Sequence, residues 1–89
     1  MNNINLNICV FTTRYVMKDK SPIVRVLHDE DGDWQFLGDE GNLQESDAMV
    51  VSLGEIIQFD ETLWGIIDLP IEKQALRNDK GTPWYIYDI

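Results

Sequence analysis

Cys9 and His28 are the residues of this sequence whose types most often act as nucleophile and base, and each type occurs only once. A thiol beside an imidazole is a common nucleophile pair in enzymes. Cys9, however, lies in an apolar stretch typical of a strand, and free cysteine is among the residue types most often buried. We therefore expect Cys9 to pack inside the protein. We expect His28 to be a surface histidine held by the neighbouring Asp29 and Glu30.

Clustered carboxylates are the other candidates for chemistry. Asp29, Asp31 and Asp33, followed by Glu40, have part of the spacing of a calcium-binding loop. The match fails because Trp34 occupies the position at which that loop needs glycine for its sharp turn. An acidic hairpin turn is the simpler interpretation. We expect no metal site, and one cysteine with one histidine are too few ligands for structural zinc.

Asp39 and Glu40 are adjacent acids on a predicted loop. A pair of carboxylates that shares acid and base roles must face each other across a cleft, which neighbours on a loop do not do. The glycine-rich motifs that hold phosphate groups do not occur in the sequence either. We therefore expect no enzyme activity and no cofactor.

The charge distribution is the strongest signal in the composition. The net charge is −9, and thirteen of the sixteen carboxylates lie between Arg25 and Lys73, an interval without lysine or arginine. A surface of this sign repels nucleic acid and attracts basic partners. We expect the partner surface to include Asp29, Glu30, Asp31, Asp33, Asp39 and Glu40. The simpler alternative is a solvated acidic face that only keeps the protein soluble.

Length and composition indicate one folded domain spanning residues 1–89. The apolar fraction of 44% is ordinary for a globular protein, and no apolar run approaches the about 20 residues of a membrane span. The N-terminal residues lack the basic region and cleavage site of a secretory signal, so we expect a cytoplasmic protein without membrane contact.

The largest apolar residues gather between Ala48 and Pro70. Within this stretch, Met49–Leu53 reads as a strand. Ser52 and Glu55 then have the spacing of a capping box, which predicts that a helix starts there. Asp60 is placed to cap a second helical turn, and Pro70 to end it. Two short helices are expected rather than one long helix.

The rest of the chain predicts strands. Residues 7–13 are typical of a first strand, and residues 23–28 and 34–37 of a hairpin around an acidic turn. Residues 72–77 and 82–87 predict a second hairpin, whose aromatic end should pack against the sheet at an edge position because of Pro83. The sum is an α+β domain with about five antiparallel strands and two short helices packed on one face.

Aromatic and basic residues offer a second kind of site. Trp34 and Trp64, together with Arg77, are candidates for a ligand pocket, although tryptophans at such spacing more often belong to the core and its rim. Arg14 and Arg77 either form ion pairs with the acidic middle of the chain or contact an anionic ligand.

A family of small bacterial domains of unknown function resembles this chain in the segments Trp34–Glu40 and Val51–Ile56, and in Phe59-Asp60 followed by Ile66–Pro70. The family has a Trp-x-Phe-x-Gly-Asp-Glu type of segment followed by a short helix-rich stretch ending in proline. Its members look like immunity proteins of toxin systems, without established enzymatic activity. The resemblance implies a non-enzymatic protein that occludes a basic toxin. A small-molecule-binding or regulatory domain is the alternative.

Overall fold

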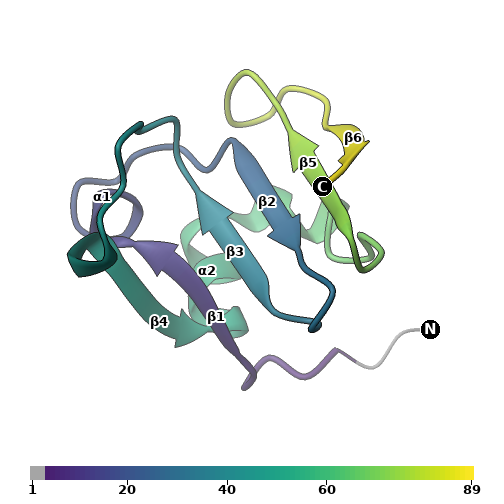
Figure 1. The fold of residues 1–89 in the computed structure, drawn as a ribbon, viewed down its shortest axis with the longest axis horizontal. Coiled ribbons are helices and arrows are strands. Elements are labelled where there is room, and N and C mark those ends of the chain that lie inside the picture. Colours follow the sequence, from purple (N-terminus) through teal and green to yellow (C-terminus); the bar gives the residue numbers. More distant parts are fainter. Residues whose placement is uncertain (1–3) are drawn as a thin grey trace.

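The computed structural model describes residues 4–89 as a six-stranded sheet with short helices (Figure 1). Along the chain the elements are β1 (Cys9–Thr13), α1 (Arg14–Met17), β2 (Arg25–His28), β3 (Trp34–Leu37), the 3₁₀ helix η1 (Glu45–Asp47), β4 (Ala48–Ser52), α2 (Leu53–Phe59), the 3₁₀ helix η2 (Glu61–Gly65), β5 (Lys73–Leu76) and β6 (Tyr85–Asp88). The predicted α+β class is confirmed.

The strands lie side by side in the order β4-β1-β3-β2-β5-β6. Both predicted hairpins form, since β2 pairs with β3 and β5 pairs with β6 in antiparallel fashion. The sheet has six strands rather than about five, and the strand predicted to end at Leu53 is present as β4, at the edge beside β1. It is also not purely antiparallel, since β1 pairs with β3 in parallel, with Phe11 opposite Gln35.

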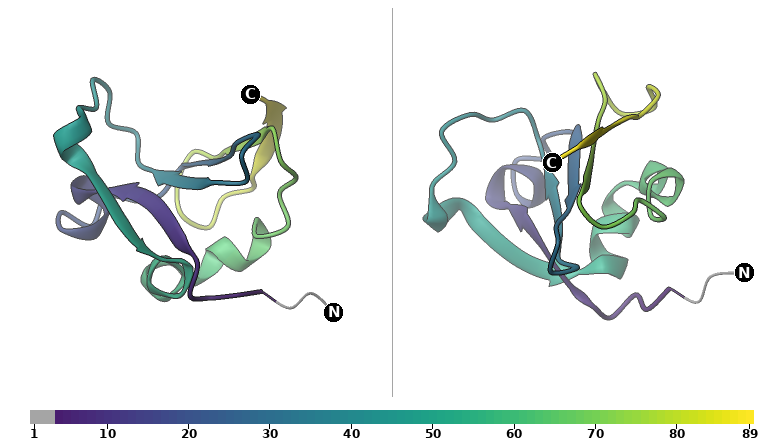
Figure 2. Two further views of the ribbon diagram at one scale, coloured as in Figure 1. Left: turned by 60° about the horizontal axis from the view of Figure 1, so that its bottom comes forward. Right: turned by 45° about the vertical axis from the view of Figure 1, so that its right-hand side comes forward.

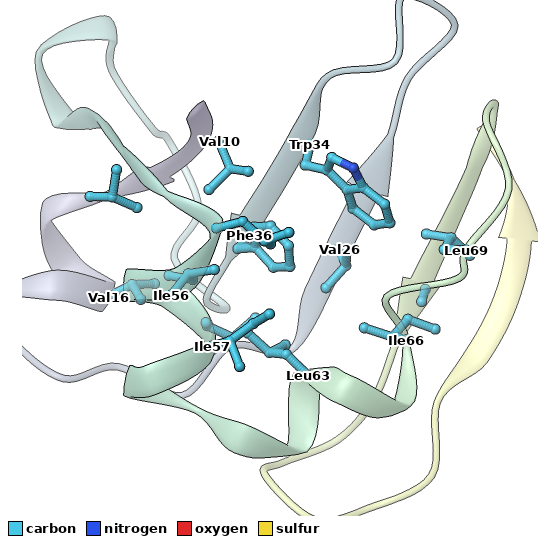
Figure 3. Close-up of a cluster of buried hydrophobic side chains, with 14 residues drawn as sticks. Val10, Val16, Val26, Trp34, Phe36, Ile56, Ile57, Leu63, Ile66 and Leu69 are labelled. Carbon is cyan, nitrogen blue, oxygen red and sulfur yellow. The ribbon is translucent and has the colours of Figure 1, made fainter. Parts of the chain in front are cut away.

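One face of the sheet carries the hydrophobic core. Side chains of β1, β2 and β3 point toward α2, η2 and the segment that follows them (Figures 2 and 3). Phe36 at the centre is fully buried, and Leu53, Ile56 and Leu63 cover it from the helical side. Residues alternate between the two faces of a strand. The opposite face, which we call the open face, therefore presents Phe11, which is 42% exposed.

The helical segment is built as its local sequence predicts. The Ser52 hydroxyl accepts from the Glu55 amide and the Glu55 carboxylate accepts from the Ser52 amide, so the predicted capping box starts α2. The Asp60 carboxylate accepts from the Thr62 amide and starts η2. These two caps divide the stretch into two short helices, as expected, and turn both apolar faces toward the sheet.

Two local predictions need correction. Thr13 ends β1 and its hydroxyl accepts from the Val16 amide, which starts the unpredicted helix α1. β6 does take an edge position, and Trp84 just before it packs against the core as predicted. Tyr85 and Tyr87, however, do not pack against the sheet and are 60% and 51% exposed. Only β5 lies beside this strand, so few apolar groups are within reach to cover its aromatic rings.

A matched pair of phenylalanine variants tests the assignment of the two faces. Phe36→Ala should lower the free energy of unfolding by about 3–5 kcal/mol, because it leaves a cavity in the core. Phe11→Ala removes an equal volume from the open face and should cost less than about 1 kcal/mol. Denaturant unfolding followed by circular dichroism measures both. Equal losses would contradict the assignment.

Candidate protein-binding surface

The acidic turn between β2 and β3 is tightly organised. Asp29 Oδ1 accepts hydrogen bonds from the amides of Asp31 and Asp33, both at 3.0 Å, and Gly32 has the positive φ of 85° that the turn requires. The carboxylates of Asp29, Asp31 and Asp33 bring oxygens within 4.8 Å of one another. Asp29 is thus partly used in shaping the turn, while Glu30, Asp31 and Asp33 are exposed to solvent.

Strand register brings two further acids to the same end of the sheet. His28 at the end of β2 lies opposite Lys73 at the start of β5, and Lys73 lies opposite Asp88 at the end of β6. Glu72 precedes Lys73, and its amide donates to the His28 carbonyl oxygen at 2.7 Å. The acidic end, as we call this region, consists of Lys73 and six carboxylates, namely Asp29, Glu30, Asp31, Asp33, Glu72 and Asp88.

The acidic end contains a hollow of about 640 Å³. Lys73 lies in it and forms an ion pair with Asp88, whose pKa the lysine lowers by a hydrogen bond and by its charge. Two exposed isoleucines add apolar surface to the same hollow. Its lining is Asp29, Glu30, Ile71, Glu72, Lys73, Asp88 and Ile89. The chemistry of this lining suits a cationic group that carries an aliphatic stem.

Asp39 and Glu40 do not belong to this surface. They follow the far end of β3, whereas the acidic turn precedes its near end, so the whole length of the strand separates the two groups. Glu40 is also turned inward, where its carboxylate accepts from the Ser21 hydroxyl at 2.8 Å and a second oxygen is buried. The expected partner-binding residues therefore lie in two places, and four of the six are at the acidic end.

Two other acids of the middle of the chain, Asp47 and Asp60, are neutralised by arginine. Asp47 is buried and pairs with Arg14 at 2.8 Å. The Gln44 amide and the Arg14 guanidinium hold the pKa of the Asp47 carboxyl below its usual range. In residues 4–89 the three ion pairs involve Asp47, Asp60 and Asp88, so the acidic turn keeps its charge uncompensated.

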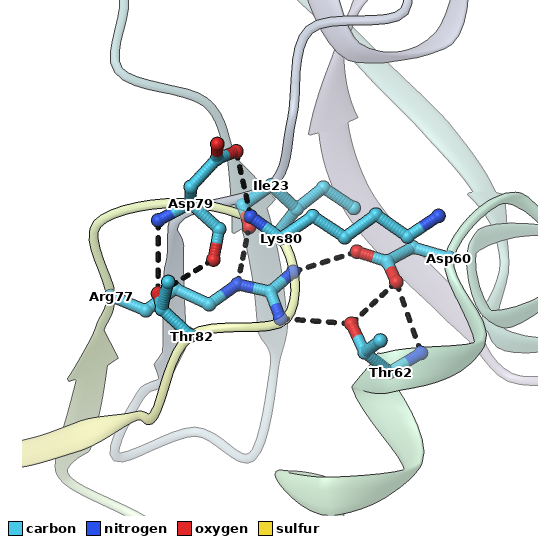
Figure 4. Close-up of polar contacts among 7 residues, drawn as sticks. All are labelled: Ile23, Asp60, Thr62, Arg77, Asp79, Lys80 and Thr82. Carbon is cyan, nitrogen blue, oxygen red and sulfur yellow. Dashed lines mark hydrogen bonds and ion pairs between the residues drawn. The ribbon is translucent and has the colours of Figure 1, made fainter.

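Arg77 forms a buried ion pair rather than a ligand site (Figure 4). Its guanidinium donates to Asp60 at 2.7 Å and to the Thr62 hydroxyl at 2.8 Å, and its Nε donates to the Ile23 carbonyl oxygen at 2.9 Å. Trp84 covers it, with the guanidinium carbon 4.2 Å from the ring centroid. These bonds leave Arg77 little capacity for an anionic ligand, and they tie the second hairpin to the cap of η2.

The two tryptophans of the expected pocket lie in different environments. Trp34 is 7% exposed and is stacked on Phe36 in the core, whereas Trp64 is 50% exposed on η2. Neither they nor Arg77 line the acidic hollow or the second hollow described below. Trp34 and Arg77 are thus buried within the fold, whereas Trp64 lies on the surface.

Cys9 and His28, the two residues considered as a nucleophile and its base, both lie in surroundings other than those predicted. Cys9 is exposed rather than packed, because it falls on the open face of β1. His28 is not held by acids: its Nδ1 donates to the Leu69 carbonyl oxygen at 2.7 Å, and its ring stacks on Trp34 at 3.9 Å between centroids. The alternation of side chains places Cys9 and His28 on opposite faces, so they do not form a pair.

A second hollow, of about 310 Å³, lies on the open face. The loop between β3 and β4 brings Leu43 and Gln44 over Phe11, Leu37 and their neighbours. The lining is largely apolar, with amide and hydroxyl groups at the sides, and consists of Phe11, Thr12, Thr13, Gln35, Leu37, Leu43, Gln44 and Ala48. Sequence reasoning missed this hollow, because β1 and the loop residues are more than 30 positions apart.

Removing Arg77 tests the buried ion pair. Arg77→Met should destabilise the protein by about 3–5 kcal/mol, because it leaves the Asp60 carboxylate buried without its partner. Arg25→Met is the matched control, since Arg25 is an exposed strand residue, and should change stability by less than about 1 kcal/mol. Chemical denaturation at neutral pH measures both, and an Arg77→Met protein as stable as the control would refute the role of the pair.

Comparison with known proteins leaves the family open. No protein-family model, curated protein or solved structure matches the chain. The resemblance to immunity-type domains therefore stays a prediction. No helix within residues 4–89 is long and apolar enough to cross a membrane.

Proposed function

We propose that this chain is a non-catalytic binding protein whose acidic end holds a basic region of a partner protein. An immunity protein that covers a basic toxin, as the resemblance implies, is the specific form of this proposal. The observation that carries it is the gathering of six carboxylates around one lysine at a single end of the sheet. With a net charge of −9 for the whole chain, this end holds more than half of the excess negative charge.

Charge of this kind acts mainly on the rate of encounter. A cluster of uncompensated carboxylates beside a hollow attracts a basic partner before contact and orients it on approach. The two isoleucines in the hollow, Ile71 and Ile89, are 51% and 60% exposed and supply apolar area that desolvates on binding. Electrostatic attraction thus brings the partner to the acidic end, and apolar contact slows its release.

The same charge argues against nucleic acid as the partner. Binding to a phosphate backbone depends on lysine and arginine side chains that displace condensed counterions. The only such side chain at the acidic end is Lys73, and it is already paired with Asp88. A protein with exposed arginine and lysine is the class of partner that this surface complements.

Charge reversal at the acidic end tests the proposal. The partner is first recovered from a lysate of the source organism on immobilised protein and identified. Glu30→Lys combined with Asp31→Lys should then slow its association about tenfold or more at low salt and flatten the salt dependence of the rate. Both side chains are exposed and neither caps the turn, so the fold should be unaffected. Surface plasmon resonance measures the rates.

The matched control places the same charge change at the other end of β3. Asp39→Lys combined with Glu45→Lys alters the net charge equally, at exposed positions, and should change the association rate less than about twofold. Equal slowing by both double variants would indicate an effect of net charge alone. An unchanged rate in the acidic-end variant would refute the proposed surface.

The second hollow supports a second candidate function, the binding of a small apolar molecule. Its volume of about 310 Å³ lies at the lower end of the range for ligand pockets, and its walls combine apolar groups with Gln35 and Gln44. The neutral dye N-phenyl-1-naphthylamine should gain fluorescence on binding there. Leu43→Glu at the rim should abolish the gain, while Val50→Glu, on the open face outside the hollow, should not. Equal responses to both variants would exclude this site.

A further inference from the structure

The outer edge of β6 has unpaired backbone groups. The Ile89 amide donates to the Glu72 carbonyl oxygen, which fixes the phase of the β5–β6 ladder. Since inward and outward groups alternate along an antiparallel strand, the amides of Tyr85 and Tyr87 face β5, and those of Ile86 and Asp88 face outward. Among residues 4–89 no strand lies beyond β6, so these outward amides and the Ile86 carbonyl oxygen can receive a further strand, whereas the Asp88 carbonyl oxygen already accepts from the Gln74 side-chain amide at 3.0 Å.

Three of the four side chains of this edge are aromatic or aliphatic and lie on both faces of the sheet, and the fourth, Asp88, is paired with Lys73. Tyr85 and Tyr87 are 60% and 51% exposed on the open face, and Ile86 is 55% exposed on the other. Natural edge strands usually avoid pairing with other chains by an inward lysine, a proline or a bulge. None of these lies within Tyr85–Asp88, and Pro83 precedes the strand.

The opposite edge of the sheet, β4, is protected against pairing with a further strand, and the edge of β6 is not. The phase of the β1–β4 ladder turns the amides of Ala48, Val50 and Ser52 outward. The Ser52 amide donates to the Glu55 carboxylate of the capping box, and the Ala48 amide donates to the Glu45 carbonyl oxygen of η1. Val50 alone remains free, so only the β6 edge offers a run of pairing groups.

We propose that a second copy of this chain pairs with β6 in antiparallel fashion and extends the sheet across a two-fold axis. With Ile86 of the two copies facing each other, Tyr85 of each copy lies opposite Tyr87 of the other. Cross-strand aromatic pairs of this kind stabilise antiparallel sheets. The outward groups of Ile86 in the two copies then bond to each other, and Asp88 faces Trp84 of the second copy, so that no like charges meet.

Charge distribution selects a second copy as the occupant. Asp88 is neutralised by Lys73 within each copy, so β6 itself carries little net charge. In an antiparallel pairing the two acidic ends lie on opposite sides of the dimer. The distance between them keeps their electrostatic repulsion small. This pairing also brings the turn that precedes β6 toward the acidic end of the other copy, and this turn adds no net charge there because Asp79 and Lys80 are adjacent in it.

Sedimentation velocity of the full chain tests the proposal from about 10 µM to about 1 mM, the range expected for a small edge-to-edge contact. The wild-type protein should shift with concentration toward twice its monomer mass of 10.3 kDa. Ile86→Lys should weaken self-association about tenfold or more, because it places two lysines opposite each other at the two-fold axis.

Val50→Lys is the matched control, because Val50 is equally exposed, at 57%, lies on the other edge and undergoes the same change of charge. It should leave self-association unchanged, and circular dichroism should show that both variants are folded. Amide hydrogen exchange gives a second readout: protection of Ile86 and Asp88 should rise with protein concentration. A wild-type protein that stays monomeric to about 1 mM, or equal effects of the two variants, would overturn the proposal.

Discussion

The pairing of β2 with β3 on one side and with β5 on the other is the constraint on which the surface of this protein depends. Because both pairings are antiparallel and in register, the end of β2, the start of β3 and the start of β5 share one end of the sheet. β6 returns beside β5 and ends there too. Acids that are up to 59 positions apart in the sequence, from Asp29 to Asp88, are thereby assembled into one charged region.

The small size of the chain imposes the second feature, a sheet covered on one face only. α2 and η2 supply enough apolar side chains to bury Phe36 and its neighbours, and within residues 4–89 no helix of comparable size covers the other side (Figure 2). Antiparallel sheets commonly tolerate such an open face. Here it is not uniformly polar, since Phe11, Leu76 and Tyr85 are exposed on it or at its edge. Exposed apolar groups of this kind often mark places where other molecules bind.

Local features of this fold were predictable because their causes are local. The Ser52 and Glu55 spacing, the Asp60 cap and the glycine of the acidic turn each act within about four residues, so the sequence displays them directly. The α+β class followed from adding such segments together. The pairing of short strands that are distant in the sequence was harder to predict. The parallel pairing of β1 with β3, for example, leaves no signal in the local sequence.

The candidate site was predictable only in part, for the same reason. The acidic turn was identified because its carboxylates are neighbours in the chain, but Glu72 and Asp88 join it only through strand register. From the sequence, Arg77 was a candidate for binding an anionic ligand. In the fold its guanidinium instead binds Asp60, which lies 17 residues earlier in the chain. Cys9 was expected inside because of its type, and the alternation of β1 decides instead that it faces solvent.

We propose that negative potential is concentrated at the acidic end and is not spread over the middle of the chain. Amide proton relaxation, measured by NMR with a cationic and then an anionic nitroxide in solution, reports the potential near each residue. We expect the largest excess of the cationic probe at Asp29–Asp33 and Glu72, and a small excess at Asp39 and Glu40. An equal excess at both ends of β3 would contradict it.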